Sequence, residues 1–183
     1  MSKKIAVIIG SSRPGRIGAN ITHWVVANLP KNDDITYEVI DLAEQNLPMF
    51  DEAMPPMMMQ YQNEHTKQWS AKISEYSGFV FVTPEYNAGY PAVLKNAIDY
   101  LLVEWKAGVV TIVSYGWSGG ASANHQLKEV FERIGSKITK TLPQVTLTKE
   151  SFGEDHQIKD IDTTFAAFAG DITKAGEELI SAL

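Results

Sequence analysis

Three short apolar segments without polar alternation constrain the fold of this chain most strongly. They cover residues 5–9, 79–83 and 109–113 and consist largely of β-branched and aromatic residues. A strand of this composition is covered on both faces, which is the usual environment of strands in a parallel sheet. Residues 35–40 alternate as a further strand, and residues 136–147, interrupted by a proline, contain a last one.

Segments with helical periodicity separate these strands. Their apolar residues recur three and four positions apart, as on the buried face of an amphipathic helix. The predicted helices cover residues 17–29, 62–76, 91–102, 121–134 and 161–183. Residues 43–60, rich in Pro and Met, show no clear period. Alternating strands and helices predict an α/β fold with a doubly wound parallel sheet, and a length of 183 residues predicts one domain over residues 1–183.

Composition excludes several classes of protein. The chain has no cysteine, so disulfides, thiolate nucleophiles and Cys-ligated metal sites are excluded, and redox chemistry would need a cofactor. The formal net charge is −6 and no basic run exceeds Lys3-Lys4, so nucleic acid is not an expected partner. The first apolar segment is too short for a signal peptide or a membrane span, and we expect a cytoplasmic protein without membrane association.

The loops at one edge of the predicted sheet are the expected binding site. In a doubly wound sheet, ligands bind beyond the carboxyl ends of the strands where the strand order reverses, which selects the loops after the first, third and fourth strands. The first loop, GSSRPGRIG at residues 10–18, places Ser11, Ser12, Arg13 and Arg16 at a helix start, where backbone N–H groups and the helix dipole bind a phosphate. It lacks the Lys-Ser/Thr of a nucleoside triphosphatase and the Gly-x-Gly-x-x-Gly of a dinucleotide site.

The other two loops indicate a flat ligand. Residues 83–91 offer the rings of Tyr86 and Tyr90 beside the amide of Asn87, a mixture that suits a polar heteroaromatic ring. Residues 114–120 carry glycines that allow a close approach of backbone to ligand. Each loop by itself is also consistent with an ordinary turn. Together the three loops match the phosphate and the tricyclic ring of flavin mononucleotide (FMN).

At these residues the chain resembles the NADPH-dependent FMN reductase family, which includes small quinone, azo-dye and chromate reductases. The most specific match is Pro84-Glu85-Tyr86-Asn87, followed by Gly89, Pro91, Leu94-Lys95-Asn96 and Asp99. In the first loop, two positions that are Ser and Asn in the family carry Arg16 and Gly18. The resemblance implies a flavodoxin-like three-layer sandwich with five parallel strands in the order 2-1-3-4-5. It also implies a homodimer or homotetramer with helices such as 91–102 at the interface.

The resemblance further implies an activity and a set of contacts. The protein would pass a hydride from NADPH or NADH through FMN to quinones, azo compounds, flavins or oxyanions in a ping-pong cycle, without a catalytic side chain because flavin N5 reacts. The residues implied to contact the FMN phosphate are Ser11, Arg13, Arg16, Ile17 and Gly18. Those implied to line the ring and complete the pocket are Pro84, Glu85, Tyr86, Asn87, Ser114, Gly116 and Gly119.

Two other functions remain open on the sequence. A flavodoxin-type electron carrier would share the fold and cofactor but usually has a dense acidic rim, and 22 acidic against 16 basic residues is a weak imbalance. A non-catalytic scaffold would need neither the aromatic loop nor Arg13. The four histidines show no metal-ligand spacing, so no metal is expected, although His125 follows the third loop and could face the substrate. The methionines at 54–59 are consistent with a dimer contact, a lid over the flavin or plain packing.

Overall fold

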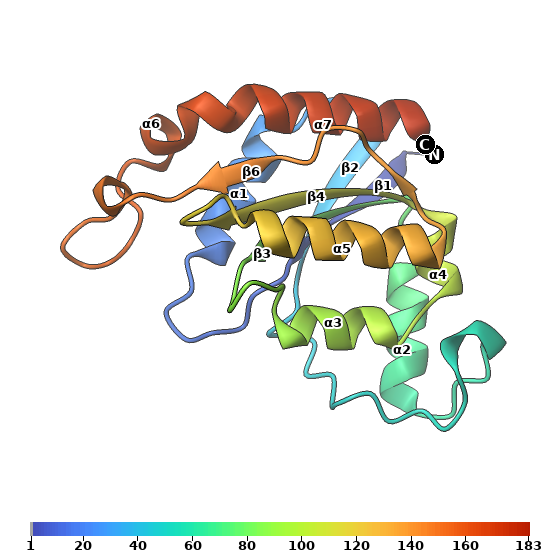
Figure 1. Ribbon diagram of the computed structural model, residues 1–183. Helices are drawn as coiled ribbons and strands as arrows, with labels where there is room; N and C mark the ends of the chain where they lie inside the picture. Colours follow the sequence, from blue (N-terminus) through green and yellow to red (C-terminus); the bar gives the residue numbers. More distant parts are fainter. Residues whose placement is uncertain (1) are drawn as a thin grey trace.

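A parallel sheet forms the centre of the computed structural model, which describes residues 2–183 (Figure 1). Its strands are β1 (Lys3–Ile9), β2 (Ile35–Asp41), β3 (Gly78–Pro84), β4 (Val109–Gly116), β5 (Lys137–Ile138) and β6 (Gln144–Thr146). They pair in the order β2-β1-β3-β4-β5, every pair is parallel, and β6 also pairs with β4. The predicted strand order is confirmed. The last predicted strand consists of two short pieces, β5 and β6, which lie along the two ends of β4.

Helices cover both faces of this sheet (Figure 1). One face carries α1 (Gly18–Asn28), α6 (Ile161–Phe165) and α7 (Ala169–Ala182). The other face carries α2 (Glu64–Ile73), α3 (Ala92–Asp99), α4 (Val103–Ala107) and α5 (Ala121–Ile134). Short 3-10 turns lie at η1 (Pro56–Met58), η2 (Lys149–Ser151) and η3 (Ala166–Phe168). The molecule is thus a flavodoxin-like three-layer sandwich, and no helix within residues 2–183 combines the length and the apolarity that crossing a bilayer requires.

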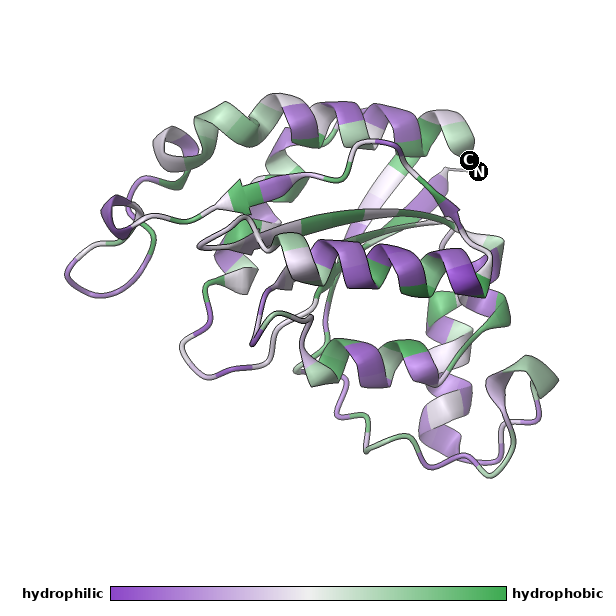
Figure 2. Cartoon of the chain, viewed as in Figure 1, coloured by the Kyte–Doolittle hydropathy of each residue, from purple (hydrophilic) through white to green (hydrophobic). Residues whose placement is uncertain are grey.

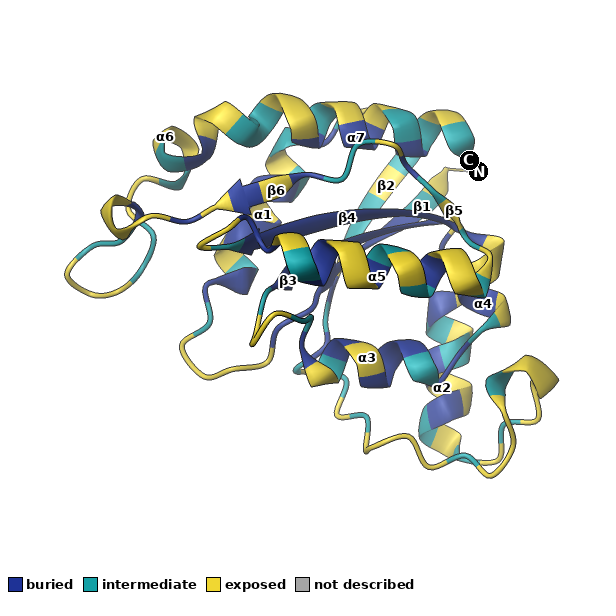
Figure 3. Cartoon of the chain, in the orientation of Figure 1, coloured by how far each residue is buried: buried dark blue, intermediate teal, exposed yellow. Residues whose placement is uncertain are grey.

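Each face of the sheet has its own hydrophobic core, which explains the apolar segments without alternation. Successive residues of a strand point to opposite faces. In β3, which is buried throughout, Phe79 and Phe81 pack with Trp105 on one face, whereas Val80 and Val82 belong to the core on the other. The central strands are therefore hydrophobic along their length in Figure 2 and buried in Figure 3. This rigid layer ends at the carboxyl edge, from which the three predicted loops emerge.

Two predicted helices differ from the observed ones where a large side chain turns into the core. The helix predicted over 91–102 ends at Asp99 in α3, and the separate short helix α4 follows it, whose buried Trp105 donates its indole N–H to the carbonyl of Ile98 at 3.0 Å. The helix predicted over 161–183 is split into α6, η3 and α7, and the fully buried Phe165 at the first break packs edge-on against an indole of α1. Helical periodicity continues through both breaks, so the sequence pattern does not reveal them.

The segment without a clear period, residues 43–60, is held by polar contacts to α3 and to the residue after it. The Asn96 side chain accepts a hydrogen bond from the N–H of Phe50 at 2.8 Å and donates one to the carbonyl of Pro48 at 2.6 Å. The hydroxyl of Tyr100 donates to the same Pro48 carbonyl at 3.1 Å. The exposed methionines of this segment are Met49, Met54, Met57, Met58 and Met59. None of them lines the cavity at the carboxyl edge, so the structure gives no support for a methionine lid.

Candidate active site

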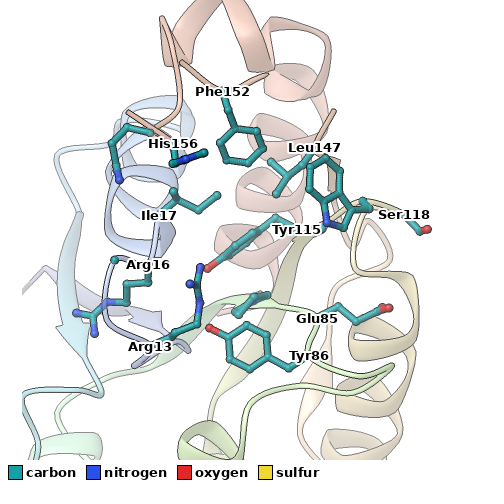
Figure 4. Close-up of a pocket in the computed structure, with 15 residues that line it drawn as sticks. Arg13, Arg16, Ile17, Glu85, Tyr86, Tyr115, Ser118, Leu147, Phe152 and His156 are labelled. Carbon is teal, nitrogen blue, oxygen red and sulfur yellow. The ribbon is translucent and has the colours of Figure 1, made fainter. Parts of the chain in front are cut away.

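The carboxyl edge of the sheet holds a cavity of about 480 Å³ (Figure 4), a size typical of small-molecule sites. The three predicted loops form most of its wall, and the segment 147–157 after β6 forms the remainder. The predicted site residues that line the cavity are Arg13, Arg16, Ile17, Pro84, Glu85, Tyr86 and Gly116. The predicted residues that lie outside its lining are Ser11, Gly18, Asn87, Ser114 and Gly119.

The two arginines of the first loop make different contacts. The Arg13 side chain points into the cavity, whereas the guanidinium of Arg16 turns away from it (Figure 4). Arg16 forms an ion pair with Asp41 at the end of β2, and both side chains are largely buried, with 20% and 14% of their surfaces exposed. Where the sequence predicts a phosphate contact for Arg16, the structure has an ion pair that ties the first loop to β2.

Ser11 and Gly18 lie behind the cavity wall and set the distance between α1 and β4. Ser11 is fully buried, and the hydroxyl of Tyr115 lies 3.5 Å from its Oγ. A Cβ added to Gly18 would come within 2.3 Å of Ser11 Oγ and within 2.6 Å of the Tyr115 hydroxyl. Glycine at position 18 therefore permits this close approach, and the asparagine expected from the family pattern would not fit without rearrangement.

A tight turn presents the aromatic ring of the second loop. Tyr86 and Gly89 exchange two backbone hydrogen bonds, from Tyr86 N–H at 2.8 Å and from Gly89 N–H at 3.1 Å. The two central residues, Asn87 and Ala88, have positive φ values of 49° and 62°, which is characteristic of a type I′ turn. Asn87 is thus an exposed turn residue, and the turn leaves Pro84 and Tyr86 facing the cavity.

Glu85 joins the second loop to the helix that follows the third loop. Its carboxylate accepts hydrogen bonds from the backbone N–H groups of Ser122 and Ala123, at 2.9 and 3.3 Å. These groups belong to the first turn of α5, where N–H donors lack intrahelical partners and a negative charge is stabilised. Glu85 lines the cavity, but its charge is directed at the helix, where it holds the two loops together.

Buried contacts shape the third loop from behind. Ser114 is fully buried, donates to the carbonyl of Gly119 at 2.7 Å and accepts from the amide of Asn124 at 3.1 Å. A Cβ on Gly120, which has φ +69°, would come within 3.0 Å of the Tyr115 backbone, so only glycine allows this turn without strain. These contacts leave Gly116, Trp117 and Ser118 at the cavity surface.

The predicted FMN contacts leave out several residues of the cavity wall. They are Gly15, Tyr115, Trp117, Ser118, Leu147, Phe152, His156 and Gln157. Tyr115, Trp117 and Ser118 belong to the predicted third loop, whose aromatic rings were a visible signal for the site. Burial raises the pKa of Tyr115 to about 12, so the phenol is neutral near pH 7. The wall residues after Thr146 arrive because β6 pairs with the end of β4, which brings this later segment to the same edge.

The histidine after the third loop lies outside the site. His125 is on the exposed side of α5, with 72% of its side chain accessible, and faces Glu129 at 3.5 Å. It does not line the cavity. In the part of the chain that the structure describes, residues 2–183, no three His, Cys, Asp or Glu side chains gather where they could hold a metal ion.

The cavity residues fit a ligand that carries an anion at one end and a planar ring at the other. Arg13 supplies a positive charge at the first loop, beside the N-terminus of α1, and a Cβ built on Gly15 would meet no atom within 4 Å, so the backbone there is open to a ligand. The rings of Tyr86 and Tyr115 flank the same space (Figure 4). Gly116 allows a flat group to approach the backbone.

Comparison with known proteins identifies the family. The model of the family described as NADPH-dependent FMN reductase matches residues 3–149, which include all three loops. The chain belongs to this FMN reductase family. It is accordingly an oxidoreductase. A protein of Schizosaccharomyces pombe described as an NAD(P)H-dependent FMN reductase is 40% identical to this chain over 177 residues, which cover 96% of this chain and 88% of the relative.

Further relatives are described as enzymes of related redox reactions. A 2-hydroxy-1,4-benzoquinone reductase of Burkholderia is 29% identical over 137 residues, or 71% of this chain and 70% of the relative. Among solved structures, a flavoenzyme NAD(P)H:(acceptor) oxidoreductase of Paracoccus denitrificans has a TM-score of 0.70 at 20% identity, covering 97% of this chain and 98% of its own. An FMN-dependent NADH-azoreductase of Bacillus anthracis in complex with FMN has a TM-score of 0.61 at 13% identity, covering 97% and 99%. These structural likenesses support the fold.

Part of the cavity lies outside the residues that the family model matches. The matched residues end at 149, whereas Phe152, His156 and Gln157 also line the cavity. The rings of Trp117 and Phe152 lie 5.8 Å apart and connect the third loop to this later segment. The family motif thus accounts for the sheet edge, and the segment after it adds a wall with its own residues.

Proposed function

We propose that this protein binds FMN in the cavity at the carboxyl edge and reduces small acceptors with NADPH or NADH. One observation carries the proposal. The charge of Arg13, the rings of Pro84 and Tyr86 and the backbone of Gly116 come from three separate loops and line one cavity. Bound FMN would supply hydride transfer between the reduced nicotinamide and the acceptor, and use of one binding site by both substrates in turn would give a ping-pong cycle.

The first loop binds the phosphate end in this proposal. Arg13 donates charge-assisted hydrogen bonds to the phosphate, and the open backbone at Gly15 and the N-terminus of α1 add N–H groups. Ile17 contributes apolar contact from the N-cap position of α1. Ser11 and Gly18 act from behind the wall, because their close contacts with Tyr115 hold the loop in place. Arg16 would need to leave Asp41 to reach the phosphate, so we assign it to the loop's attachment.

The second and third loops orient the ring and exclude water. Pro84 and Tyr86 supply a rigid apolar surface on one side, and Gly116 permits backbone contact at the ring edge. Trp117 and Phe152 shield the outer side from solvent. The carboxylate of Glu85 is engaged by α5, so it is not assigned a proton-transfer role. Asn87, Ser114 and Gly119 do not line the cavity, and we assign them to the geometry of the second and third loops.

The proposed acceptors are quinones, azo compounds, free flavins and oxyanions. A cavity with flat aromatic walls and few charged groups suits planar aromatic acceptors in particular. The relatives described as a benzoquinone reductase and an azoreductase support these classes. We also propose that the protein acts in the cytoplasm, because a chain without cysteine needs no oxidising compartment.

We also propose that the protein is a homodimer that associates through α3 and α5. A groove of about 600 Å³ lies between these helices, and its apolar lining includes Ile98, Leu101, Leu102, Val130 and Ile134. The exposed methionine segment reaches this groove at Pro56, so a dimer would also cover apolar surface there. Sedimentation equilibrium at micromolar concentration is expected to give twice the mass of the chain, and a monomer would contradict the proposal.

A direct assay tests the proposed function. The purified protein is expected to be yellow or to quench the fluorescence of added FMN, and to consume NADPH or NADH when a quinone is present. Parallel lines in double-reciprocal plots at several quinone concentrations would support the ping-pong cycle. A yellow protein that does not oxidise nicotinamide but exchanges electrons with a reductase would instead be a flavodoxin-type carrier. A protein that binds no FMN would refute both functions.

A further inference from the structure

The segment 149–160 places one histidine at the cavity in a constrained conformation. His156 has a φ of +59°, a left-handed conformation that is uncommon for residues other than glycine and that marks candidate functional positions. Its N–H donates to the carbonyl of Gly153 at 3.1 Å, and the N–H of Gly153 donates to the carbonyl of Gln157 at 2.9 Å. Asp155 Oδ1 accepts from the N–H of Gln157 at 3.0 Å. The turn is thus closed by its own hydrogen bonds.

The base of this turn is fixed as well. Phe152 and Ile158 form an antiparallel bridge, and the N–H of Lys159 donates to the carbonyl of Ser151 at 3.0 Å. Phe152 packs against Trp117, so the turn is docked on the third loop. His156 is therefore presented to the cavity by a defined structure, and in Figure 4 its ring lies next to Ile17 and on the same side of the cavity as Arg13.

The charges around the cavity leave Arg13 and His156 available to an anion. Four of the lining residues are ionisable cations or anions: Arg13, Arg16, Glu85 and His156. Arg16 is paired with Asp41, and Glu85 is bound to the first turn of α5. Within residues 2–183, neither Arg13 nor His156 takes part in an ion pair. The neighbours Glu154 and Asp155 do not line the cavity, and the Asp155 carboxylate is turned to the backbone of Gln157.

The first loop also offers fewer side chains to a phosphate than its sequence suggests. Arg16 is withdrawn by its ion pair, and Gly18 carries no side chain. A phosphate monoester is a dianion with three acceptor oxygens, and it is bound most strongly when several charged donors surround it. Arg13 approaches the cavity from the first loop, and an additional donor from the segment after β6 would complete the site. His156 is the ionisable donor that the later segment brings to the cavity.

We propose that His156 is a phosphate-recognising residue that acts together with Arg13 on a phosphate monoester in this cavity. The inference rests on the proposed function, because FMN and NADPH both carry such a group: FMN has its terminal phosphate, and NADPH has the extra phosphate that NADH lacks. The shared chemistry is recognition of a monoester dianion by a guanidinium and an imidazole. The two sources are separated by comparing each ligand with its counterpart that lacks the phosphate.

The test uses a variant that keeps the backbone conformation. Asparagine tolerates a positive φ but is too short to replace the imidazole, so His156→Asn removes the donor without straining the turn. His125→Asn is the matched control, because His125 is exposed on α5 outside the cavity. Binding of FMN and of riboflavin to the apoprotein is measured by fluorescence quenching, and KM is measured for NADPH and for NADH.

Two results would support the inference and identify the source of the phosphate. If His156→Asn weakens FMN binding about 5- to 20-fold and leaves riboflavin binding within twofold, His156 binds the FMN phosphate. If His156→Asn raises KM for NADPH by a similar factor and leaves KM for NADH unchanged, His156 binds the phosphate that NADPH has and NADH lacks. In both cases His156→Gln, which restores a donor of greater length, is expected to recover part of the effect, and His125→Asn is expected to match the wild type.

Other results would overturn it. Unchanged ratios between FMN and riboflavin and between NADPH and NADH would remove His156 from phosphate recognition, and equal losses for both members of each pair would show that it only packs the wall. In either case wild-type FMN binding and turnover would leave the proposed function intact. If the wild type bound neither FMN nor riboflavin, the proposed function would fail and this inference with it.

Discussion

The two halves of the cavity are built in different ways. The sheet-edge half rests on buried anchors, since Ser11, Thr83 and Ser114 are all fully buried and hold the loops to the core. The half contributed by residues 147–157 is more exposed and is held by backbone hydrogen bonds within its own turn and by the contact of Phe152 with the third loop.

This difference separates two kinds of mutational effect. A side chain on the sheet edge is part of the core packing, so changing it is expected to alter cofactor binding and stability together. A side chain on the later segment contacts the ligand from a local turn, so changing it is expected to alter binding of cofactor or substrate with little loss of stability. The family model covers the three loops of the sheet edge and ends before most of the later segment.

The largest expected effect comes from the two arginines of the first loop. Arg13→Ala should weaken FMN binding by about 1.5–3 kcal/mol, because a charge-assisted hydrogen bond is lost. Arg16→Ala should change the dissociation constant by less than about threefold, because its guanidinium is paired with Asp41. Titration of both apoproteins with FMN measures this. Equal losses in the two variants would mean that Arg16 leaves its ion pair when FMN binds.

Two glycines test whether the sheet edge depends on close packing. Gly18→Ala should lower stability by about 1–3 kcal/mol, because its Cβ would overlap Ser11 Oγ and the Tyr115 hydroxyl. Gly170→Ala is the control, since a Cβ there meets no atom within 4 Å, and alanine favours a helix by up to about 1 kcal/mol. Thermal unfolding should show a lower Tm for the first variant and an unchanged or higher Tm for the second. Equal Tm values would show that the first loop adapts without strain.

Glu85 tests the connection between the second and third loops. Glu85→Gln should cost about 1 kcal/mol, because the first turn of α5 loses a negative charge. We expect a lower Tm and a severalfold weaker binding of FMN, with kcat almost unchanged. Glu129→Gln on the exposed side of α5 is the control. A large loss of kcat with normal FMN binding would instead assign Glu85 to the chemistry.

The smallest expected effect lies on the later segment. Phe152→Ala removes the ring that packs against Trp117, an aromatic contact worth about 0.5–1.5 kcal/mol. KM for an aromatic quinone should rise a few fold, while Tm and FMN binding stay near wild type. Phe50→Ala, a partly exposed ring outside the cavity, should leave KM unchanged. A marked fall in Tm for Phe152→Ala would show that this segment is as much a part of the core as the sheet edge.

Local sequence signals predicted the elements better than their exact limits. The apolar runs at 5–9, 79–83 and 109–113 are inside β1, β3 and β4, because a strand buried on both faces must be apolar along its length. The helix breaks between α3 and α4 and before α7 were not predicted, because they depend on how the side chains of Trp105 and Phe165 are buried in the core. Periodicity reports which residues are apolar and carries no information on such local bends.

The sequence by itself determined the parallel sheet and the three loops that gather at its carboxyl edge, because these depend on short apolar runs and on general rules of chain connection. The order of the strands came from the family resemblance of the loop motifs. The tertiary structure alone decided which side chains of those loops face the cavity. Arg16 turns to Asp41, Glu85 turns to α5, and His156 reaches the site through β6. Each of these outcomes depends on a partner or a strand pairing distant in the sequence, so no local pattern could specify it.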